Sequence, residues 1–244
     1  MQVEINRSTI PAVQLPQNGG FYKKYIKRPM DFILSLMAII ILSPVLLIIA
    51  ILVRVKLGSP VIFRQKRPGL NEKIFTLYKF RTMTDKRDEN GELLPDGERL
   101  TKFGKFLRST SLDELPELWN IIKGDMSIVG PRPQLVRDMV FMTEEQRCRH
   151  TAIPGLTGLA QVSGRNAVTW EEKLQFDLEY VSDITLIGDV RIIFITITKV
   201  IKRDGISSEN NDTADDLGDY LLRSGKISEE VYLDGQEKSK LLVN

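Results

Sequence analysis

The sequence contains little that could hold zinc or form a covalent cross-link. Among its 244 residues there is one cysteine, Cys148, and one histidine, His150. A lone cysteine excludes an intramolecular disulfide, which fits a reducing compartment. These two side chains are too few for a Cys/His zinc site, and neither lies in a motif that marks a nucleophile. We interpret both as structural or incidental residues.

Several common active-site motifs are also absent. The chain has no G-x-x-x-x-G-K-[ST] phosphate loop, no G-x-G-x-x-G, no H-E-x-x-H and no G-x-S-x-G. Common nucleotide-binding and hydrolase functions therefore lack their usual anchor in this sequence.

Charge is small in sum, at +2, but it is unevenly distributed. Residues 21–108 contain 18 Lys and Arg against 8 Asp and Glu, whereas residues 204–244 contain 4 against 10. The basic segment is expected to meet an anion such as lipid headgroups or phosphates, with a solvated charged surface as the alternative. Nucleic acid is not an expected partner, because the basic residues are not interleaved with a recognition motif.

One hydrophobic segment, residues 32–53, runs for 22 residues without a charge. At about 1.5 Å per helical residue it is long enough to cross a hydrocarbon layer of about 30 Å. It begins too far into the chain for an ordinary signal peptide and lacks a small-residue cleavage site. We therefore predict a membrane-embedded helix rather than a buried core helix.

Two features of this segment favour a re-entrant helix over a spanning one. Both flanks are basic, so the positive-inside rule places both ends on the cytoplasmic side. The pair Ser43-Pro44 lies at the midpoint, where proline removes a backbone donor and kinks the helix, while the serine hydroxyl can satisfy a freed carbonyl. A kinked spanning helix stays open as the alternative.

The rest of the chain predicts a small β element followed mainly by helices. Residues 61–83 are predicted as two short strands around Pro68-Gly69, and residues 85–97 as a loop. Capping patterns and apolar spacing predict further helices. These are expected over residues 111–123, over 169–182 and, as an interfacial helix with a buried strand as competitor, over 184–201.

The candidate chemistry starts from an acidic pair, Asp113-Glu114, with Arg108 just before it. Acids in a first helical turn usually cap amide groups, so position alone favours capping over catalysis. Two Pro- and Gly-rich loops that follow shift this balance, because they contain Arg132 and Arg165. Rigid loops with arginines are typical of phosphate binding.

A further acid, Asp177, lies on the apolar side of its predicted helix, with Trp170, Leu174 and Leu178. A partly buried carboxylate at this position needs a cation or hydrogen-bond donors.

In their order along the chain, these motifs resemble the bacterial sugar transferase family, the monotopic phosphoglycosyl transferases that act on polyprenyl phosphate. The resemblance covers roughly residues 25–207, about three quarters of the chain, and leaves out a polar arm and an acidic tail. The matching motifs are Lys27-Arg28-Pro29-Met30-Asp31, Ser43-Pro44, Phe63-Arg64-Gln65, Lys79-Phe80-Arg81-Thr82-Met83, Arg108-Ser109, Ser111-Leu112-Asp113-Glu114-Leu115-Pro116, Gly124-Asp125-Met126-Ser127, Gly130-Pro131-Arg132-Pro133, Pro154-Gly155 and Gly164-Arg165-Asn166.

The resemblance implies a two-step transfer with Asp113 and Glu114 as the catalytic pair. Asp113 would attack the β-phosphate of a UDP-sugar, expel UMP and form an aspartyl-phosphosugar, which polyprenol (undecaprenyl) phosphate would then attack. Glu114 is expected to position a metal or the pair, since neighbouring residues do not share a helix face. An N-acetylated hexose is the sugar that the resemblance favours. A nucleotide-sugar-binding scaffold without turnover is the alternative.

The same resemblance, together with the chemistry of phosphate, implies a bound metal ion and side chains that bind phosphate. An aspartate is ordinarily ionised at neutral pH, so its difficulty is the approach to an anionic diphosphate. Mg²⁺ (or Mn²⁺) held at Asp113 would shield that repulsion. The candidates for binding phosphate and nucleotide are Lys79, Arg108, Arg132 and Arg165, and Asp177 matches an acidic position near the active site of the family.

The expected fold is α+β and helix-dominated, with a re-entrant helix–break–helix and a cytosolic domain that has interfacial amphipathic helices. The expected divisions are a polar arm (1–20), a membrane region (21–58), a catalytic domain (59–207) and an acidic extension (208–244). The resemblance implies a monotopic protein of the bacterial inner membrane, in contact with the phospholipid bilayer and with its catalytic domain on the cytoplasmic face. The sequence leaves the oligomeric state open, a dimer included.

Overall fold

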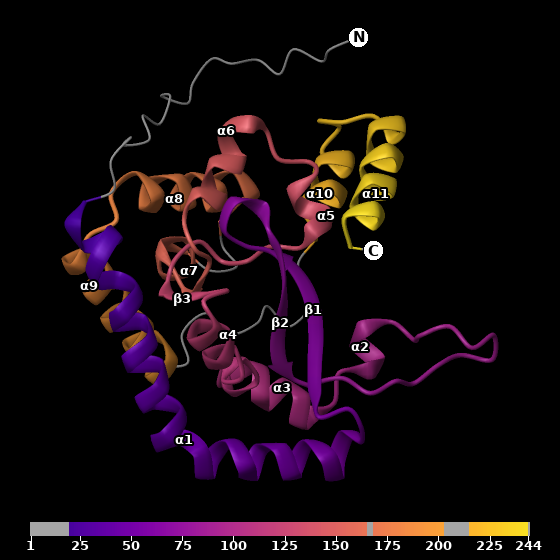
Figure 1. The fold of residues 1–244 in the computed structure, drawn as a ribbon. Coiled ribbons are helices and arrows are strands. Elements are labelled where there is room, and N and C mark those ends of the chain that lie inside the picture. The colour runs from indigo at the N-terminus through magenta and orange to yellow at the C-terminus, as the bar shows by residue number, and fades with distance from the viewer. Residues whose placement is uncertain (1–19, 165–167, 203–214, 244) are drawn as a thin grey trace.

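The structure, a computed structural model, describes residues 20–164, 168–202 and 215–243. Helices surround a two-stranded hairpin, and one long helix, α1, runs down one side of the molecule and along its base (Figure 1). This arrangement confirms the helix-dominated α+β class. The predicted polar arm lies almost entirely outside the described residues.

Helix α1 (Lys27–Leu57) contains the long apolar run and follows a π-helical turn, η1 (Tyr22–Ile26). Within the described residues, the helical stretch Tyr22–Leu57 is the one that is long and apolar enough to cross a membrane. The ribbon of α1 turns about midway along its length (Figure 1). The Ser43 hydroxyl donates a 2.8 Å hydrogen bond to the carbonyl of Ile40, which Pro44, lacking an N–H, leaves without its helical donor. The predicted break is therefore a bend within a continuous helix.

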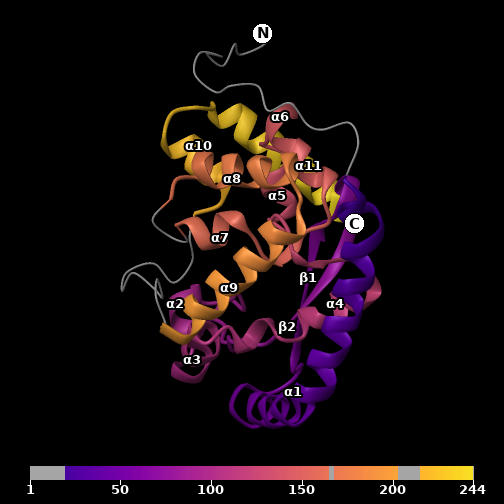
Figure 2. The same ribbon diagram turned by 90° about the vertical axis from the view of Figure 1, so that its left-hand side faces the viewer.

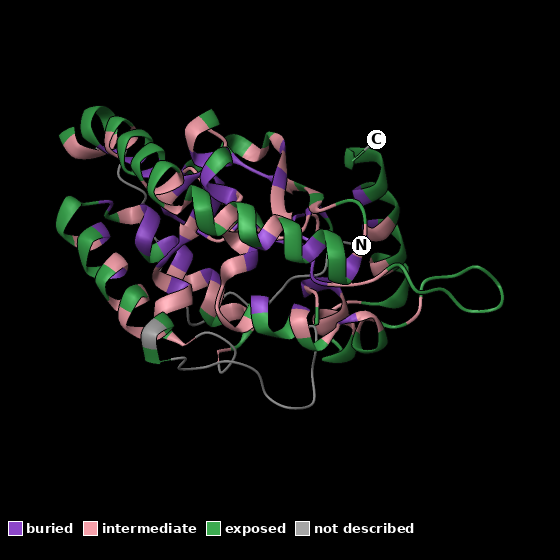
Figure 3. Ribbon diagram, turned by 90° about the horizontal axis from the view of Figure 1, so that it is seen from below, coloured by how far each residue is buried: buried purple, intermediate pink, exposed green. Residues whose placement is uncertain are grey.

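The two halves of α1 bury different side chains. The first half buries a polar stripe formed by Lys27, Asp31 and Ser35, whereas the second half buries an apolar stripe. That second stripe consists of Ile49, Val53 and Leu57. Many of the apolar side chains between the stripes are exposed, although Ile39, Leu42 and Leu46 pack partly on the core, and the view from below shows the second half crossing the front of the molecule largely uncovered (Figure 3).

A buried ion pair and buried hydrogen bonds hold the start of α1 against the rest of the chain. Lys27 Nζ lies 2.5 Å from Asp189 Oδ2, and that carboxylate also accepts from the hydroxyl of Tyr180 at 2.9 Å. Asp31 accepts from the Ser127 hydroxyl at 2.6 Å. Because a buried charge is stable only when paired, these contacts fix the entry of α1 to two distant segments.

The predicted β element is confirmed as an antiparallel hairpin of β1 (Ile62–Pro68) and β2 (Ile74–Phe80), joined through a short turn, η2 (Leu70–Glu72). The segment predicted as a loop ends in one helical turn, α2 (Asp96–Arg99). A second sheet was not predicted: β3 (Ser127–Val129) pairs in parallel with β4 (Gly155–Thr157).

Short helices form the middle of the chain, and the helices of 13 or more residues that follow α1 lie toward its C-terminal end (Figure 2). The short ones are α3 (Lys102–Ser109), η3 (Leu112–Glu114), α4 (Glu117–Lys123), α5 (Val136–Met139), α6 (Glu144–Arg147), η4 (Cys148–Thr151) and α7 (Leu159–Ser163). The later ones are α8 (Trp170–Ser182), α9 (Leu186–Lys202), α10 (Leu217–Arg223) and α11 (Glu229–Val243).

The helix predicted over 169–182 is confirmed, because Thr169 accepts from the amide of Glu172 and forms the capping box that begins α8. The segment 184–201 is a helix, α9, and not a strand. Its exposed apolar residues recur at helical spacing and include Ile187, Val190 and Phe194.

Candidate active site

The acidic pair lies in a tight turn between two helices and not at the start of one long helix. Ser111 has a left-handed backbone (φ 55°) and its side chain caps no amide, so the predicted capping box is absent. Asp113 and Glu114 belong to the 3-10 turn η3, and α4 begins only after Pro116, which has no N–H to donate. The capping explanation for the two acids therefore fails at this position.

Helix α3 brings Arg108 toward the end of β2. A Cβ at Gly104 would stand 1.9 Å from the carbonyl oxygen of Thr82, so glycine is required for this close approach. The Arg108 guanidinium donates to the Thr82 hydroxyl at 3.1 Å and stabilises the negative charge of Asp113 electrostatically.

Two cations meet the carboxylate of Glu114. Lys79 Nζ lies 2.7 Å from Glu114 Oε1, and Arg132 Nη2 lies 2.8 Å from the same oxygen. Asn120 fixes the register of α4 on β2, because its amide donates to the carbonyl of Thr76 and its oxygen accepts from the amide of Tyr78. The predicted residues Lys79, Arg132 and Glu114 are thus brought together from three segments.

The two neighbouring acids have opposite electrostatics. Burial raises the pKa of Asp113, and the adjacent Glu114 charge raises it further, against the opposing effect of Lys79, Arg108 and Arg132. Burial alone would also raise the pKa of Glu114, but its ion pairs with Lys79 and Arg132 lower it well below the usual range. The expectation that Asp113 is as readily ionised as an ordinary aspartate therefore neglected its burial.

Glu117 is a third acid of the site that the sequence analysis missed. Its carboxylate is 3% exposed and lies 3.1 Å from Lys79 Nζ, so one ammonium bridges Glu114 and Glu117. Burial is the largest influence on Glu117 and raises its pKa to about 7. The spacing of three residues from Glu114 was the available signal, since residues three apart lie on one side of a helical turn.

Asp177 is linked to the Arg132 loop through Arg149. The carboxylate is buried and accepts from Arg149 Nε at 2.9 Å and from Nη2 at 2.6 Å. This supplies the cation that the sequence predicted. Arg149 Nη2 also donates to the backbone carbonyl of Arg132 at 2.6 Å. The geometry indicates that Asp177 supports the loop that holds Arg132.

The predicted phosphate ligand Arg165 lies outside the described residues. The described part of the chain contains no group of three or more His, Cys, Asp and Glu side chains placed to hold a metal ion. Mg²⁺ is commonly held by one or two carboxylates together with substrate phosphates. Glu114 is already paired to two cations, so the site offers the carboxylate of Asp113. This fits a magnesium ion that is held by one carboxylate together with the phosphates of the substrate.

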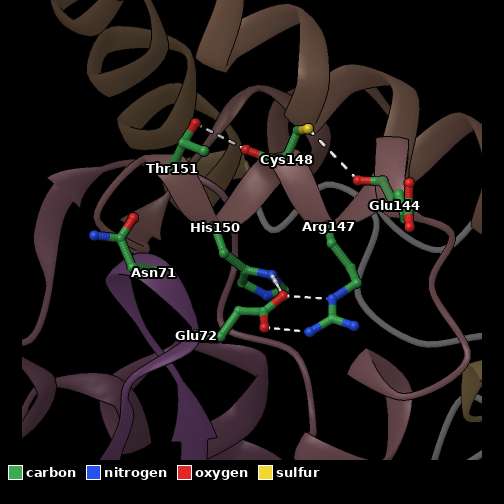
Figure 4. A pocket seen from close by; sticks show the side chains of 7 residues that line it. All are labelled: Asn71, Glu72, Glu144, Arg147, Cys148, His150 and Thr151. Carbon is green, nitrogen blue, oxygen red and sulfur yellow. Dashed lines mark hydrogen bonds and ion pairs between the residues drawn. The ribbon is translucent and has the colours of Figure 1, made fainter.

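A surface pocket of about 290 Å³ lies at the turn of the hairpin, near η2, α6 and η4 (Figure 4). There Glu72 points toward Arg147 and accepts from its Nε at 2.6 Å, beside the ring of His150. Lys79 lies near the opposite end of the hairpin, so this pocket is separate from the acidic pair. Burial lowers the pKa of His150 to about 4, which keeps the imidazole neutral at pH 7.

Comparisons with known proteins agree with the motifs from which the site is built. The sequence model of the bacterial sugar transferase family matches residues 22–203. The chain belongs to this family. It is therefore a transferase, and all the described site residues lie within the matched region.

Relatives in the family differ in length. An uncharacterized sugar transferase, EpsL of Bacillus subtilis, is 48% identical over 190 residues, which are 78% of this chain and 94% of EpsL. The exopolysaccharide production protein ExoY of Sinorhizobium fredii is 36% identical and covers 80% of this chain and 95% of ExoY. A UDP-glucose:undecaprenyl-phosphate glucose-1-phosphate transferase of Klebsiella pneumoniae is 40% identical over 78% of this chain, but the match spans only 43% of its length.

Proposed function

We propose that this protein transfers a sugar-1-phosphate from a UDP-sugar to polyprenol (undecaprenyl) phosphate, as a membrane step of glycan or exopolysaccharide synthesis. The observation that best supports this is the buried acidic pair with three cations around it. Glu114 forms ion pairs with Lys79 and Arg132. The neighbouring carboxylate of Asp113 feels the charge of both cations. The Klebsiella relative is named for a reaction of this type.

In the proposed reaction an oxygen of the Asp113 carboxylate forms a bond to the β-phosphorus of the UDP-sugar. The bond between that phosphorus and the oxygen bridging the two phosphates breaks, and UMP leaves with the bridging oxygen. A phosphate oxygen of the polyprenol then attacks the same phosphorus and releases the Asp113 carboxylate. No proton transfer is needed at the nucleophile, provided that Asp113 is ionised.

The cations have distinct positions for this reaction. Arg132 is 42% exposed at its side chain and can reach a phosphate while its backbone is held by Arg149. Lys79 is more buried and fixes Glu114 and Glu117. A magnesium ion held by Asp113 and the diphosphate would neutralise charge on the phosphates. Arg108 also stabilises the ionised form of Asp113.

We infer that α1 lies in the membrane as a re-entrant helix, with the catalytic domain at the cytoplasmic surface of the bacterial inner membrane. Its exposed apolar side chains on both halves form a surface suited to lipid, and its ribbon turns midway and then runs along the base of the molecule (Figure 1). Basic residues at both flanks favour that side being the cytoplasm.

The decisive experiment measures UMP release by the full-length, detergent-solubilised protein with undecaprenyl phosphate and Mg²⁺. A panel of donors should include N-acetylated UDP-hexoses, UDP-glucose and UDP-galactose, because the identity of the transferred sugar is to be determined. Two relatives are named as glucose and galactose enzymes. Asp113→Asn should abolish release and leave membrane association intact. The exposed Asp183→Asn is the matched control.

Mass analysis of protein quenched with the donor alone should detect a phosphosugar adduct on the peptide containing Asp113. Full activity of Asp113→Asn, or an adduct on another residue, would overturn the mechanism. Donor binding without UMP release from any panel member would instead favour a scaffold that binds nucleotide sugars.

A further inference from the structure

The C-terminal helices α10 and α11 lie beyond the region matched by the family, yet they pack on α5, which follows the loop of Arg132. Both stand beside α5 (Figure 1). The ring of Phe141, just after α5, fits between two glycines of this helical pair. A Cβ at Gly218 would stand 2.5 Å from the ring, and a Cβ at Gly235 would stand 2.4 Å from it. With a larger residue at either position, the Phe141 ring would have to shift.

One buried carboxylate joins the helical pair to the Arg132 loop. Asp138 of α5 is 2% exposed. Its Oδ1 accepts from the amide of Leu217, the first residue of α10, at 3.0 Å. Its Oδ2 accepts from the amide of Leu135 at 2.9 Å, three residues after Arg132. The same side chain therefore holds both segments, and an acceptor so buried is costly to leave unpaired.

The helical pair has a second attachment on α8. The indole Nε1 of Trp170 donates to the carbonyl of Asp215 at 3.0 Å, and the Tyr220 hydroxyl donates to Glu171 at 2.9 Å. Helix α8 also contains Asp177, whose partner Arg149 donates to the backbone of Arg132. The pair thus contacts both elements that hold the Arg132 loop.

We propose that α10 and α11 form a clamp that positions Arg132 for the phosphate of the sugar nucleotide, with Asp138 as the positioning residue. This rests on the proposed function for the identity of the ligand, but the mechanical link does not. When the clamp is displaced, Asp138 loses the amide of Leu217, so the carboxylate that accepts from Leu135 is held less firmly and the Arg132 loop is supported mainly through Arg149. Arg132 then spends less time at the position set by Glu114, and nucleotide binding weakens.

The test displaces the clamp without touching the catalytic groups. Gly235→Val places two methyl groups where the Phe141 ring lies. We expect the KM for the UDP-sugar, and the Kd for UDP measured by calorimetry, to rise about tenfold or more, with kcat changed less, since a group that grips substrate and transition state alike acts mainly on KM. Glu237→Val, two residues further along α11 and exposed, is the control and should behave as wild type.

Rescue and amide exchange separate positioning from general destabilisation. Phe141→Leu lacks the two ring atoms closest to Gly235 and should restore KM in the Gly235→Val background. Hydrogen exchange should accelerate at Leu135 in Gly235→Val, while the Tyr78 amide on β2 keeps its protection. If Gly235→Val does not fold, Asp138→Asn, which keeps the shape and loses one acceptor, serves for the same measurements.

Displaced helices with unchanged KM and unchanged Leu135 exchange would overturn the clamp. If the wild-type protein released no UMP with any donor, the proposed function would fail, while faster Leu135 exchange and weaker UDP binding would still support the clamp.

Discussion

Replacing Glu114 with glutamine isolates the charge that holds Lys79 and Arg132 at the site. The substitution keeps the shape and one carbonyl oxygen, but it converts two charge-assisted hydrogen bonds, of 2.7 and 2.8 Å, into bonds to a neutral acceptor. Such bonds to charged groups contribute about 1.5–3 kcal/mol, against about 1 kcal/mol for neutral ones, so each loses roughly 1 kcal/mol.

The two losses do not count equally. The side chains of Lys79 and Glu114 are 17% and 19% exposed, whereas that of Arg132 is 42% exposed, so water screens the Arg132 bond more strongly. A total of about 1.5–2 kcal/mol is therefore expected. If the bonds matter fully in the transition state, kcat/KM falls about 10–30-fold, at 1.36 kcal/mol per tenfold.

The assay is UMP release under kcat/KM conditions, with the exposed Glu89→Gln as the matched control. A loss as complete as that of Asp113→Asn would mean that Glu114 takes part in bond formation, and a rate within about twofold of wild type would mean that the cations need no anchor. Either result would refute the positioning role inferred from these distances.

Three further perturbations test other parts of the structure. The pKa of Glu117 is raised to about 7 from the ordinary 4.5, so its protonated form favours folding. The stability that it contributes at low pH is therefore lost as pH rises toward 7. Glu117→Gln should flatten the pH dependence of Tm between about pH 4.5 and 7. Arg149→Met leaves the Asp177 carboxylate buried and unpaired, so unfolding should be easier by about 3–5 kcal/mol in denaturant titration, and adding Asp177→Asn should recover part of this loss. In a Cys148→Ser background, Lys23→Cys and Arg54→Cys should both resist an impermeant thiol reagent added to intact cells, and labelling of one position alone would indicate a spanning α1.

The sequence predicted the parts of this protein that follow from local pattern. Two short apolar runs around Pro68-Gly69 predicted the hairpin, and apolar residues at helical spacing predicted α8, because both patterns depend on neighbours along the chain. The freed carbonyl at Ile40 and its serine donor also followed from proline chemistry alone. By contrast, the turn at Ser111 depends on a left-handed backbone that no local pattern required.

What the sequence could not supply is the pairing of charges across distant segments. Asp177 was recognised as a buried acid, but its partner Arg149 is 28 residues away and follows from the packing of η4 on α8. Glu117 was overlooked because its role depends on Lys79, which the fold brings from β2. The link from α10 to the Arg132 loop likewise exists only once Asp138 is placed between them.

The contrast between Asp113 and Glu114 also bears on which of them is the nucleophile. The Glu114 carboxylate is occupied by two cations that lower its pKa, so its lone pairs are engaged and its basicity is reduced. Asp113 retains a raised pKa, and a more basic carboxylate is the stronger nucleophile whenever it is ionised. In the proposed reaction, Glu114 therefore holds the cations that meet the phosphate, and Asp113 is the carboxylate that attacks. An adduct on Glu114 in the trapped protein would reverse this assignment.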